Sequence, residues 1–172
     1  FNSSKAKEVA TGPAPSAMCW LYKCQPFAIE FVVRAYMTGS TSTSIWKNYE
    51  GGCRNYCGHP LPEGMKKNQK LEAVILTPTT KDAVDRPISC EEIVAEGIMT
   101  QEDLDVCGSK CLEVFKFAQG IAAKNGLILV DTKFEMGKTS EGEIIMIDEM
   151  LTPDSSRYWL LNSYEERHNA GQ

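Results

Sequence analysis

The sequence predicts a globular domain of mixed strands and helices, organised around one β-hairpin. Residues 127–136 and 143–150 are rich in Ile, Leu, Val and Met, are short enough for strands, and are joined by a polar Gly-containing turn. Residues 100–124 have the apolar spacing of a long helix and lead directly into the first of these strands. With 172 residues, 42% of them hydrophobic, the chain can bury a substantial core in one compact domain.

The N-terminal part of the chain predicts a linker followed by strands. Residues 1–17 are small and polar and contain Pro and Gly, which is typical of a linker. The apolar content then rises, and we expect Pro26 to separate a strand at residues 18–23 from a second at residues 27–36. A further short strand is predicted at residues 71–76, ending in a hydroxyl-rich loop.

A loop rich in Gly and hydroxyl groups, TGSTSTS at residues 38–44, precedes a short helix predicted by the spacing of Ile45, Trp46 and Tyr49. Such a loop presents free backbone N–H groups at a helix N-terminus, which suit an anion. Arg34 just upstream adds a positive charge. The same pattern is also typical of an ordinary loop and helix cap, so both interpretations stay open.

Two capping signals predict two structural helices in the second half of the chain. Ser89 with Glu92 starts a short helix, and Thr100 starts a long one that Asn125-Gly126 ends. The expected buried stripe of the long helix consists of six apolar residues: Leu104, Cys107, Cys111, Val114, Ala118 and Ile121.

Period-2 alternation predicts different roles for the two faces of the hairpin. A turn centred on Glu141-Gly142 places Glu135 opposite Asp148. One face then carries charged side chains and the other carries apolar side chains that pack in the core. The charged set is Asp131, Lys133, Glu135 and Asp148, and the apolar set is Phe134, Met136, Ile145 and Ile147.

The facing carboxylates of Glu135 and Asp148 indicate a candidate metal site. Two carboxylates opposite each other repel, and each raises the pKa of the other, unless a cation lies between them. Oxygen-only ligation with room for phosphate oxygens suits Mg²⁺. The alternative is a solvated hairpin face on which Lys133 already lies between the acids, and the spacing does not decide between the two.

Further charged residues flank the hairpin in the sequence. Residues 152–154 predict a turn that brings Ser156 and Arg157 close to the charged face. Arg157 has the planar guanidinium group that clamps a phosphate through two hydrogen bonds. Glu30 and Arg34 share one strand face, where the plain interpretation is that they pair with each other.

Charge and composition exclude several classes of partner. A formal net charge of −5 at pH 7 and a pI near 5.1 argue against nucleic acid or an anionic membrane, although a small anionic substrate can meet a local basic pocket. No apolar run reaches the ~18 residues of a membrane-spanning helix, so we expect a soluble protein without a membrane partner. Seven cysteines, an odd number without a regular framework, favour a reduced intracellular compartment.

Six short strings, taken together and in order, closely resemble the SAICAR synthetase family. They are EFVVRAYMTGSTSTSIW, RNYCG, KNQKL, LTPTTK, GLILVDTKFEMG and IDEMLTPDSSRYW. The PTTK, RNYCG and DSSRYW variants are more similar to the eukaryotic and plant-like branch than to the compact bacterial one. The resemblance implies an α+β fold related to ATP-grasp and kinase-like architectures, with an antiparallel sheet and packed helices.

The same resemblance implies a domain organisation. Residues 18–172 would be the lobe that binds ATP and substrate, incomplete at its C-terminal end. Residues 1–17 would be a linker or the remnant of an N-terminal nucleotide lobe, which the chain otherwise lacks.

The resemblance implies an ATP-dependent carbon–nitrogen ligase of de novo purine (IMP) biosynthesis, with ATP and Mg²⁺ as cofactors. Its small-molecule substrates would be carboxyaminoimidazole ribotide and L-aspartate, joined through an acyl phosphate. Glu135 and Asp148 match the metal carboxylates, and Lys133 beside them completes the implied catalytic set. The implied substrate-binding residues are Arg34, Ser40, Lys81, Asp85, Asp154, Ser156 and Arg157, and the implied nucleotide-binding residue is Glu30.

The loop at residues 81–87 departs from the family pattern, because Asp85 matches the Asp of a His-Asp pair whose His is absent. Two other functions stay open. One is a kinase-type phosphoryltransferase that uses the same hairpin with a hydroxyl acceptor, and the other is a non-catalytic, ribotide-binding remnant of the family. We expect a cytoplasmic protein, or a plastid one if a transit peptide precedes this chain. The oligomeric state stays open.

Overall fold

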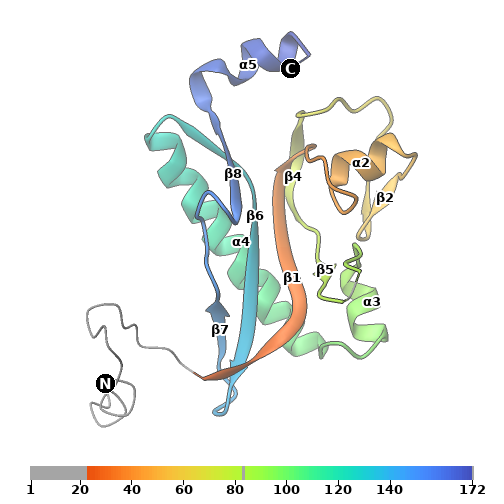
Figure 1. Ribbon diagram of the computed structural model, residues 1–172, viewed down its shortest axis with the longest axis vertical. Helices are drawn as coiled ribbons and strands as arrows, with labels where there is room; N and C mark the ends of the chain where they lie inside the picture. The colour runs from red at the N-terminus through yellow and green to blue at the C-terminus, as the bar shows by residue number, and fades with distance from the viewer. Residues whose placement is uncertain (1–22, 83, 172) are drawn as a thin grey trace.

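The computed structural model describes residues 23–82 and 84–171 (Figure 1). The strands are β1 (Cys24–Tyr36), β2 (Asn55–Tyr56), β3 (His59–Pro60), β4 (Lys70–Leu76), β5 (Thr79–Thr80), β6 (Leu127–Thr139), β7 (Ile144–Ile147) and β8 (Ser156–Leu160). The helices are α2 (Ile45–Glu50), α3 (Cys90–Ala95), α4 (Gln101–Lys124) and α5 (Leu161–Asn169). This combination confirms the expected α+β fold. In the described ranges, no helix has both the length and the apolarity that crossing a membrane requires.

The main sheet is antiparallel and is built around two long strands. Its central path runs β4-β1-β6-β7, with β5 also pairing with β1 and β8 also pairing with β6. Strands β1 and β6 have 13 residues each and lie side by side at the centre (Figure 1). The side chains of these two strands therefore determine what each face of the sheet presents.

Strand β1 starts earlier than expected, because Pro26 lies inside it and does not divide two strands. Among the described residues, β1 pairs at this end with β6 alone, so the missing N–H of Pro26 costs no bond to a second neighbour. The register with β6 then shifts between Pro26 and Glu30. Of the strand expected at residues 18–23, residues 18–22 lie outside the described part, and Lys23 precedes β1.

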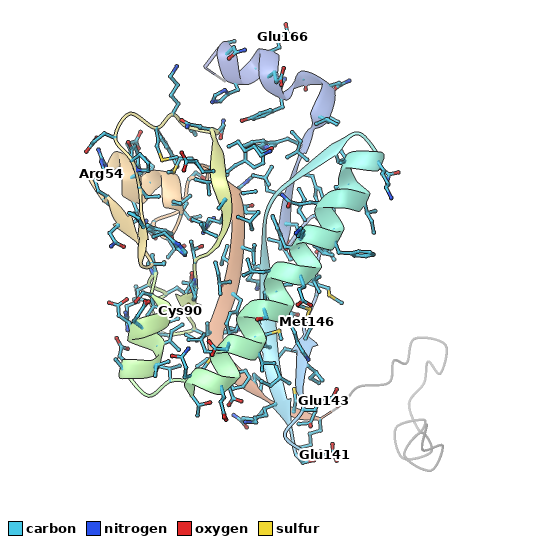
Figure 2. All side chains as sticks on the ribbon, turned by 180° about the vertical axis from the view of Figure 1, so that it is seen from behind. Arg54, Cys90, Glu141, Glu143, Met146 and Glu166 are labelled. Atoms are coloured by element: carbon cyan, nitrogen blue, oxygen red, sulfur yellow. The ribbon has the colours of Figure 1, made fainter. Side chains whose placement is uncertain are left out.

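Helix α4 covers one face of the sheet and makes the core with it, as Figure 2 shows. Buried sheet residues of this face include Ile29, Phe31 and Val33 from β1 and Phe134 and Met136 from β6. Since side chains alternate along a strand, the intervening residues of β1 and β6 point to the opposite face. That opposite face carries the charged side chains.

The predicted start of α4 at Thr100 and its end at Asn125 are confirmed, but one position of the predicted stripe, Ile121, is wrong, since it is 48% exposed. Val114 is partly buried and packs against the core, and Phe115 and Ala122 are buried without having been predicted. The helix advances 3.6 residues per turn, so a stripe drawn with too many three-residue steps drifts around the helix.

The hairpin of β6 and β7 forms as predicted, but its register is one residue away from the predicted one. Glu135 pairs with Ile147 and not with Asp148. The cause lies in the turn, where the backbone N–H of Thr139 bonds to the carbonyl of Glu143 (2.8 Å). Turn geometry sets the register of a hairpin, and this turn differs from the one assumed from sequence.

A one-residue shift exchanges the two faces of β7. Ile144 is buried and Met146 packs against the core, on the same side as α4. Ile145 and Ile147 are only partly buried and lie on the face that carries Glu135. The predicted core positions of Ile145 and Ile147 are therefore wrong.

A second, smaller apolar cluster holds α2 against the sheet and consists of Met37, Ile45, Tyr49, Tyr56, Leu61 and Leu71. The predicted helix at Ile45 is confirmed, with Ser44 as its N-cap. The hydroxyl of Tyr56 donates to the carbonyl of Thr43 (2.5 Å), which fastens the hydroxyl-rich loop. This loop is thereby held beside Arg34.

Candidate active site

The sheet face opposite α4 carries two groups of charged side chains. The first, which we call the arginine clamp, consists of Arg34, Asp131 and Arg157. The second, which we call the lysine–carboxylate cluster, consists of Glu30, Lys81, Lys133, Glu135 and Asp148. Both groups use β6, where Asp131, Lys133 and Glu135 alternate toward the same face.

The arginine clamp is a row of three residues across three adjacent strands. Arg34 of β1 and Arg157 of β8 are both register partners of Asp131 on β6. Oδ2 of Asp131 accepts hydrogen bonds from Nη1 of Arg34 (3.2 Å) and Nη1 of Arg157 (2.6 Å). The plain interpretation that Arg34 pairs with Glu30 is therefore wrong.

An irregularity in β6 places Arg157 in this row. Leu129 pairs with Tyr158, and the same register continued would set Asp131 opposite Ser156. The register shifts between Leu129 and Asp131, so Arg157 takes that place instead. A bulge of this kind re-aims a side chain without interrupting the sheet.

The two arginines differ in how firmly they are held. Arg34 is 7% exposed, and its Nε also donates to Oγ1 of Thr77 (2.9 Å). Its Nη2 reaches the carbonyl of Thr43 at 3.5 Å. The Arg157 side chain is 41% exposed. Burial raises the pKa of Asp131, and the guanidinium groups of Arg157 and Arg34 act in the opposite direction.

The lysine–carboxylate cluster is centred on Lys133. Its Nζ lies 3.0 Å from Oε1 of Glu135, 3.3 Å from Oε1 of Glu30 and 3.9 Å from Oδ2 of Asp148. The other oxygen of Glu135, Oε2, accepts from Nζ of Lys81 at 2.6 Å. Both oxygens of Glu135 therefore contact an ammonium group.

The electrostatics of this cluster favour the charged forms of Glu135 and Lys133. Burial by itself raises the pKa of Glu135, but hydrogen bonds from Lys81 and Lys133 outweigh it and lower this pKa. Burial by itself lowers the pKa of Lys133, and the carboxylates of Glu135 and Glu30 outweigh it and raise this pKa. Carboxylates and ammonium groups in this cluster stabilise each other.

Asp148 reaches the cluster by a route that the sequence pattern does not indicate. It lies beyond the end of β7 and has a positive φ of 61°, a conformation that non-Gly residues adopt rarely. From there its carboxylate meets Lys133 without facing Glu135 across the hairpin. The two proposed metal carboxylates thus surround one ammonium group.

The other predicted site residues are not members of these two groups. Ser40, Asp85 and Asp154 are exposed. Ser156 is a register partner of Thr132, and its hydroxyl lies 2.6 Å from Oγ1 of Thr132, which is buried on the side of α4. The expectation that Ser156 lies with Arg157 at the charged face is therefore wrong, because neighbours on a strand point to opposite faces.

Sequence reasoning missed the roles of Asp131 and Thr77 in holding Arg34. Asp131 was placed on the charged face, but nothing local showed that two arginines share it. Thr77 lies 43 residues from Arg34 and is fully buried, so only the fold brings them together. The alternation of Asp131, Lys133 and Glu135 was the one available signal.

An antiparallel sheet with a helix on one face and two groups of paired charged side chains on the other defines an α+β protein with a candidate site on its open sheet face. The family can be stated more narrowly. The model of the SAICAR synthetase family matches residues 4–172, and the chain belongs to this family.

Two relatives illustrate the extent of the match. The chain is 57% identical over 151 residues to phosphoribosylaminoimidazole-succinocarboxamide synthase of Legionella pneumophila (strain Lens), covering 87% of this chain and 48% of that protein. It is 61% identical over 150 residues to the chloroplastic enzyme of that name from Arabidopsis thaliana, covering 87% of this chain and 36% of that protein. The chain thus spans about half or less of the length of these relatives.

Solved structures agree with this assignment. SAICAR synthase from Saccharomyces cerevisiae, complexed with SAICAR, matches with a TM-score of 0.73 at 31% identity, covering 91% of this chain and 51% of that chain. A SAICAR synthetase (type 2) in complex with ADP matches with a TM-score of 0.63 at 25% identity, covering 87% and 59%. The family expected from the sequence strings is confirmed.

Proposed function

We propose that this chain supplies the ribotide- and metal-binding half of an ATP-dependent carbon–nitrogen ligase. The reaction joins carboxyaminoimidazole ribotide to L-aspartate and yields SAICAR, ADP and phosphate. The observation that carries the proposal is the adjacency of the arginine clamp and the lysine–carboxylate cluster on one sheet face. Asp131 belongs to the first and Lys133 to the second, two residues apart on β6.

The arginine clamp binds the ribotide phosphate in this proposal. Guanidinium groups recognise phosphate oxygens through paired, charge-assisted hydrogen bonds. Arg157 provides the accessible group and Arg34 the buried one. The exposed residues Ser40, Asp85 and Asp154 remain predicted substrate contacts. We no longer propose Ser156 as one, because its hydroxyl meets Thr132 on the α4 side.

Lys133 acts on the reacting end of the ribotide. A carboxylate is a poor electrophile, so transfer of the γ-phosphoryl group of ATP to its oxygen forms an acyl phosphate and releases ADP. The aspartate amine then attacks the acyl carbon, and phosphate leaves. The ammonium group of Lys133 neutralises negative charge that develops on the transferring phosphoryl group or on the substrate carboxylate.

The residues present fit Mg²⁺. Glu135 and Asp148 offer hard carboxylate oxygens around the same point, and Mg²⁺ is commonly held by one or two carboxylates plus phosphate oxygens and water. Within residues 23–82 and 84–171 no group of three or more His, Cys, Asp or Glu side chains is placed to hold a metal, so phosphate oxygens and water would have to complete the coordination. When bound, Mg²⁺ neutralises phosphate charge.

The nucleotide and the compartment belong to the same proposal. The ADP complex of a structural relative supports ATP as cosubstrate, and we assign Glu30 to the nucleotide side of the site. We propose a cytoplasmic location. The chloroplastic name of the Arabidopsis relative supports the plastid as the alternative.

Product analysis of the full-length protein tests this function. With the ribotide, MgATP and aspartate, we expect an amide product whose formation depends on aspartate. A stable phosphoester formed without aspartate would identify a kinase-type phosphoryltransferase instead. Ribotide binding without any turnover would identify a non-catalytic member of the family, and either result would overturn the proposal.

A further inference from the structure

Asp131 is a negatively charged residue inside a site proposed to bind an anion. Its side chain is 9% exposed and lies between Arg34 and Arg157 on the central strand of the row. A carboxylate at that place repels a phosphate, and the repulsion is poorly screened where water is excluded. Its presence therefore requires a contribution that outweighs this repulsion.

We propose that Asp131 is a positioning residue that holds the guanidinium groups of Arg34 and Arg157 in the orientation that receives the ribotide phosphate. The inference rests on the proposed function of the clamp. Asp131 acts through the two arginines, because its Oδ2 accepts a hydrogen bond from each.

The effect falls mainly on Arg157. Arg34 is also held by Thr77 and by the carbonyl of Thr43. Within the described ranges, the guanidinium group of Arg157, whose side chain is 41% exposed, hydrogen-bonds only to Asp131. That bond uses Nη1, so Nε and Nη2 remain available to a ligand.

Fixing Arg157 before the ligand arrives favours binding. A free arginine side chain samples many rotamers, and ordering it on binding costs free energy that the complex must recover. Asp131 removes this cost by ordering the side chain in the unliganded protein. The two guanidinium groups still exceed its single negative charge, so the clamp keeps a net positive charge for the phosphate.

The variant Asp131→Asn separates positioning from charge because the two predict opposite signs. By charge alone, removing a carboxylate strengthens phosphate binding. Positioning predicts weaker binding, by about tenfold, because the neutral amide oxygen of asparagine holds the two guanidinium groups less firmly than a carboxylate oxygen does.

Calorimetry on the full-length protein measures the effect for wild type, Asp131→Asn, Arg157→Ala and the double variant, with the ribotide and with ADP. We expect weaker ribotide binding in both single variants, an unchanged ADP affinity, and little further loss in the double variant. Glu141→Gln removes the same charge at the hairpin turn and should change neither affinity. Equal or tighter ribotide binding by Asp131→Asn, or additive losses in the double variant, overturns the inference.

Wild-type protein that binds no ribotide would instead refute the proposed function, and the inference with it. Asp131→Asn leaves the buried Arg34 without its ion-pair partner and can prevent folding. In that case NMR of the arginine side chains in unliganded wild type decides. Slow guanidinium rotation of both Arg34 and Arg157 supports positioning, and free rotation of Arg157 overturns it.

Discussion

The carboxylate of Glu135 is contacted by two ammonium groups, which lower its pKa. Lys133 and Lys81 contact different oxygens of this residue. Lys133 comes from the same strand, whereas Lys81 arrives from a loop 54 residues away. Because the Lys81 side chain is 39% exposed, it is the contact that can leave with little change in packing.

Removing Lys81 should free one oxygen of Glu135 for a cation. We expect Lys81→Met to bind Mg²⁺ about two- to fivefold more tightly in the nucleotide-free protein, the size that a partly exposed ion pair supports. Calorimetric titration with Mg²⁺ measures this, with Lys67→Met, an exposed lysine on another loop, as control. An unchanged or weaker affinity would show that Lys81 does not compete for Glu135.

The lowered pKa of Glu135 predicts a pH-dependent contribution to stability. Its folded-state pKa lies below the ordinary value of 4.5, so the contribution is present above pH 4.5 and is lost as the pH falls through the folded-state pKa. Urea unfolding should therefore find Glu135→Gln less stable than wild type at pH 7, and by a smaller margin at pH 3. The exposed Glu72→Gln is the control. A destabilisation of the same size at both pH values would contradict this account.

At the scale of elements, α4 shows what periodicity can and cannot predict. The sequence predicts both ends of the helix because the capping residues Thr100 and Asn125 interact with backbone groups close to them in the chain. The predicted buried face deviates toward the end of the helix, where Ala122 is buried in place of the expected Ile121 and Phe115 is buried beside the partly buried Val114. Small errors in angle accumulate along 24 residues.

Two substitutions on α4 test this corrected face. Phe115→Ala should lower the free energy of unfolding by about 3–5 kcal/mol, because it opens a cavity in the core. Ile121→Ala should cost less than about 1 kcal/mol, since the side chain is half exposed. Urea denaturation of both variants provides the comparison. Similar losses of unfolding free energy in the two variants would contradict the corrected face and support the buried stripe expected from the sequence.

The β6–β7 hairpin shows that alternation predicts the face of a strand residue but not its partner on the next strand. Alternation along β6 correctly placed Asp131, Lys133 and Glu135 on one face, because a strand alternates whatever its partner is. The partner of Glu135 depended on a turn whose geometry the residue types did not determine. Asp148 nevertheless joined the cluster, through its unusual backbone conformation beyond β7.

At the scale of the whole molecule, the fold assembles the site from segments that no local pattern connects. Arg34, Asp131 and Arg157 come from three strands and meet only because β1 and β8 flank β6. The resemblance to the family implied a role for Arg34 and Arg157 but did not indicate how the two are arranged in space. The carboxylate between them, and the register shift that brings Arg157 to it, required the structure.

The central claim is that the lysine–carboxylate cluster performs ligase chemistry in the full-length protein. The direct measurement is the steady-state rate of aspartate-dependent SAICAR formation by wild type, Glu135→Ala and Asp148→Ala, with Glu72→Ala as control. We predict a loss of at least about 100-fold in both site variants and a normal rate in the control. Near-normal turnover by Glu135→Ala or Asp148→Ala would contradict the account.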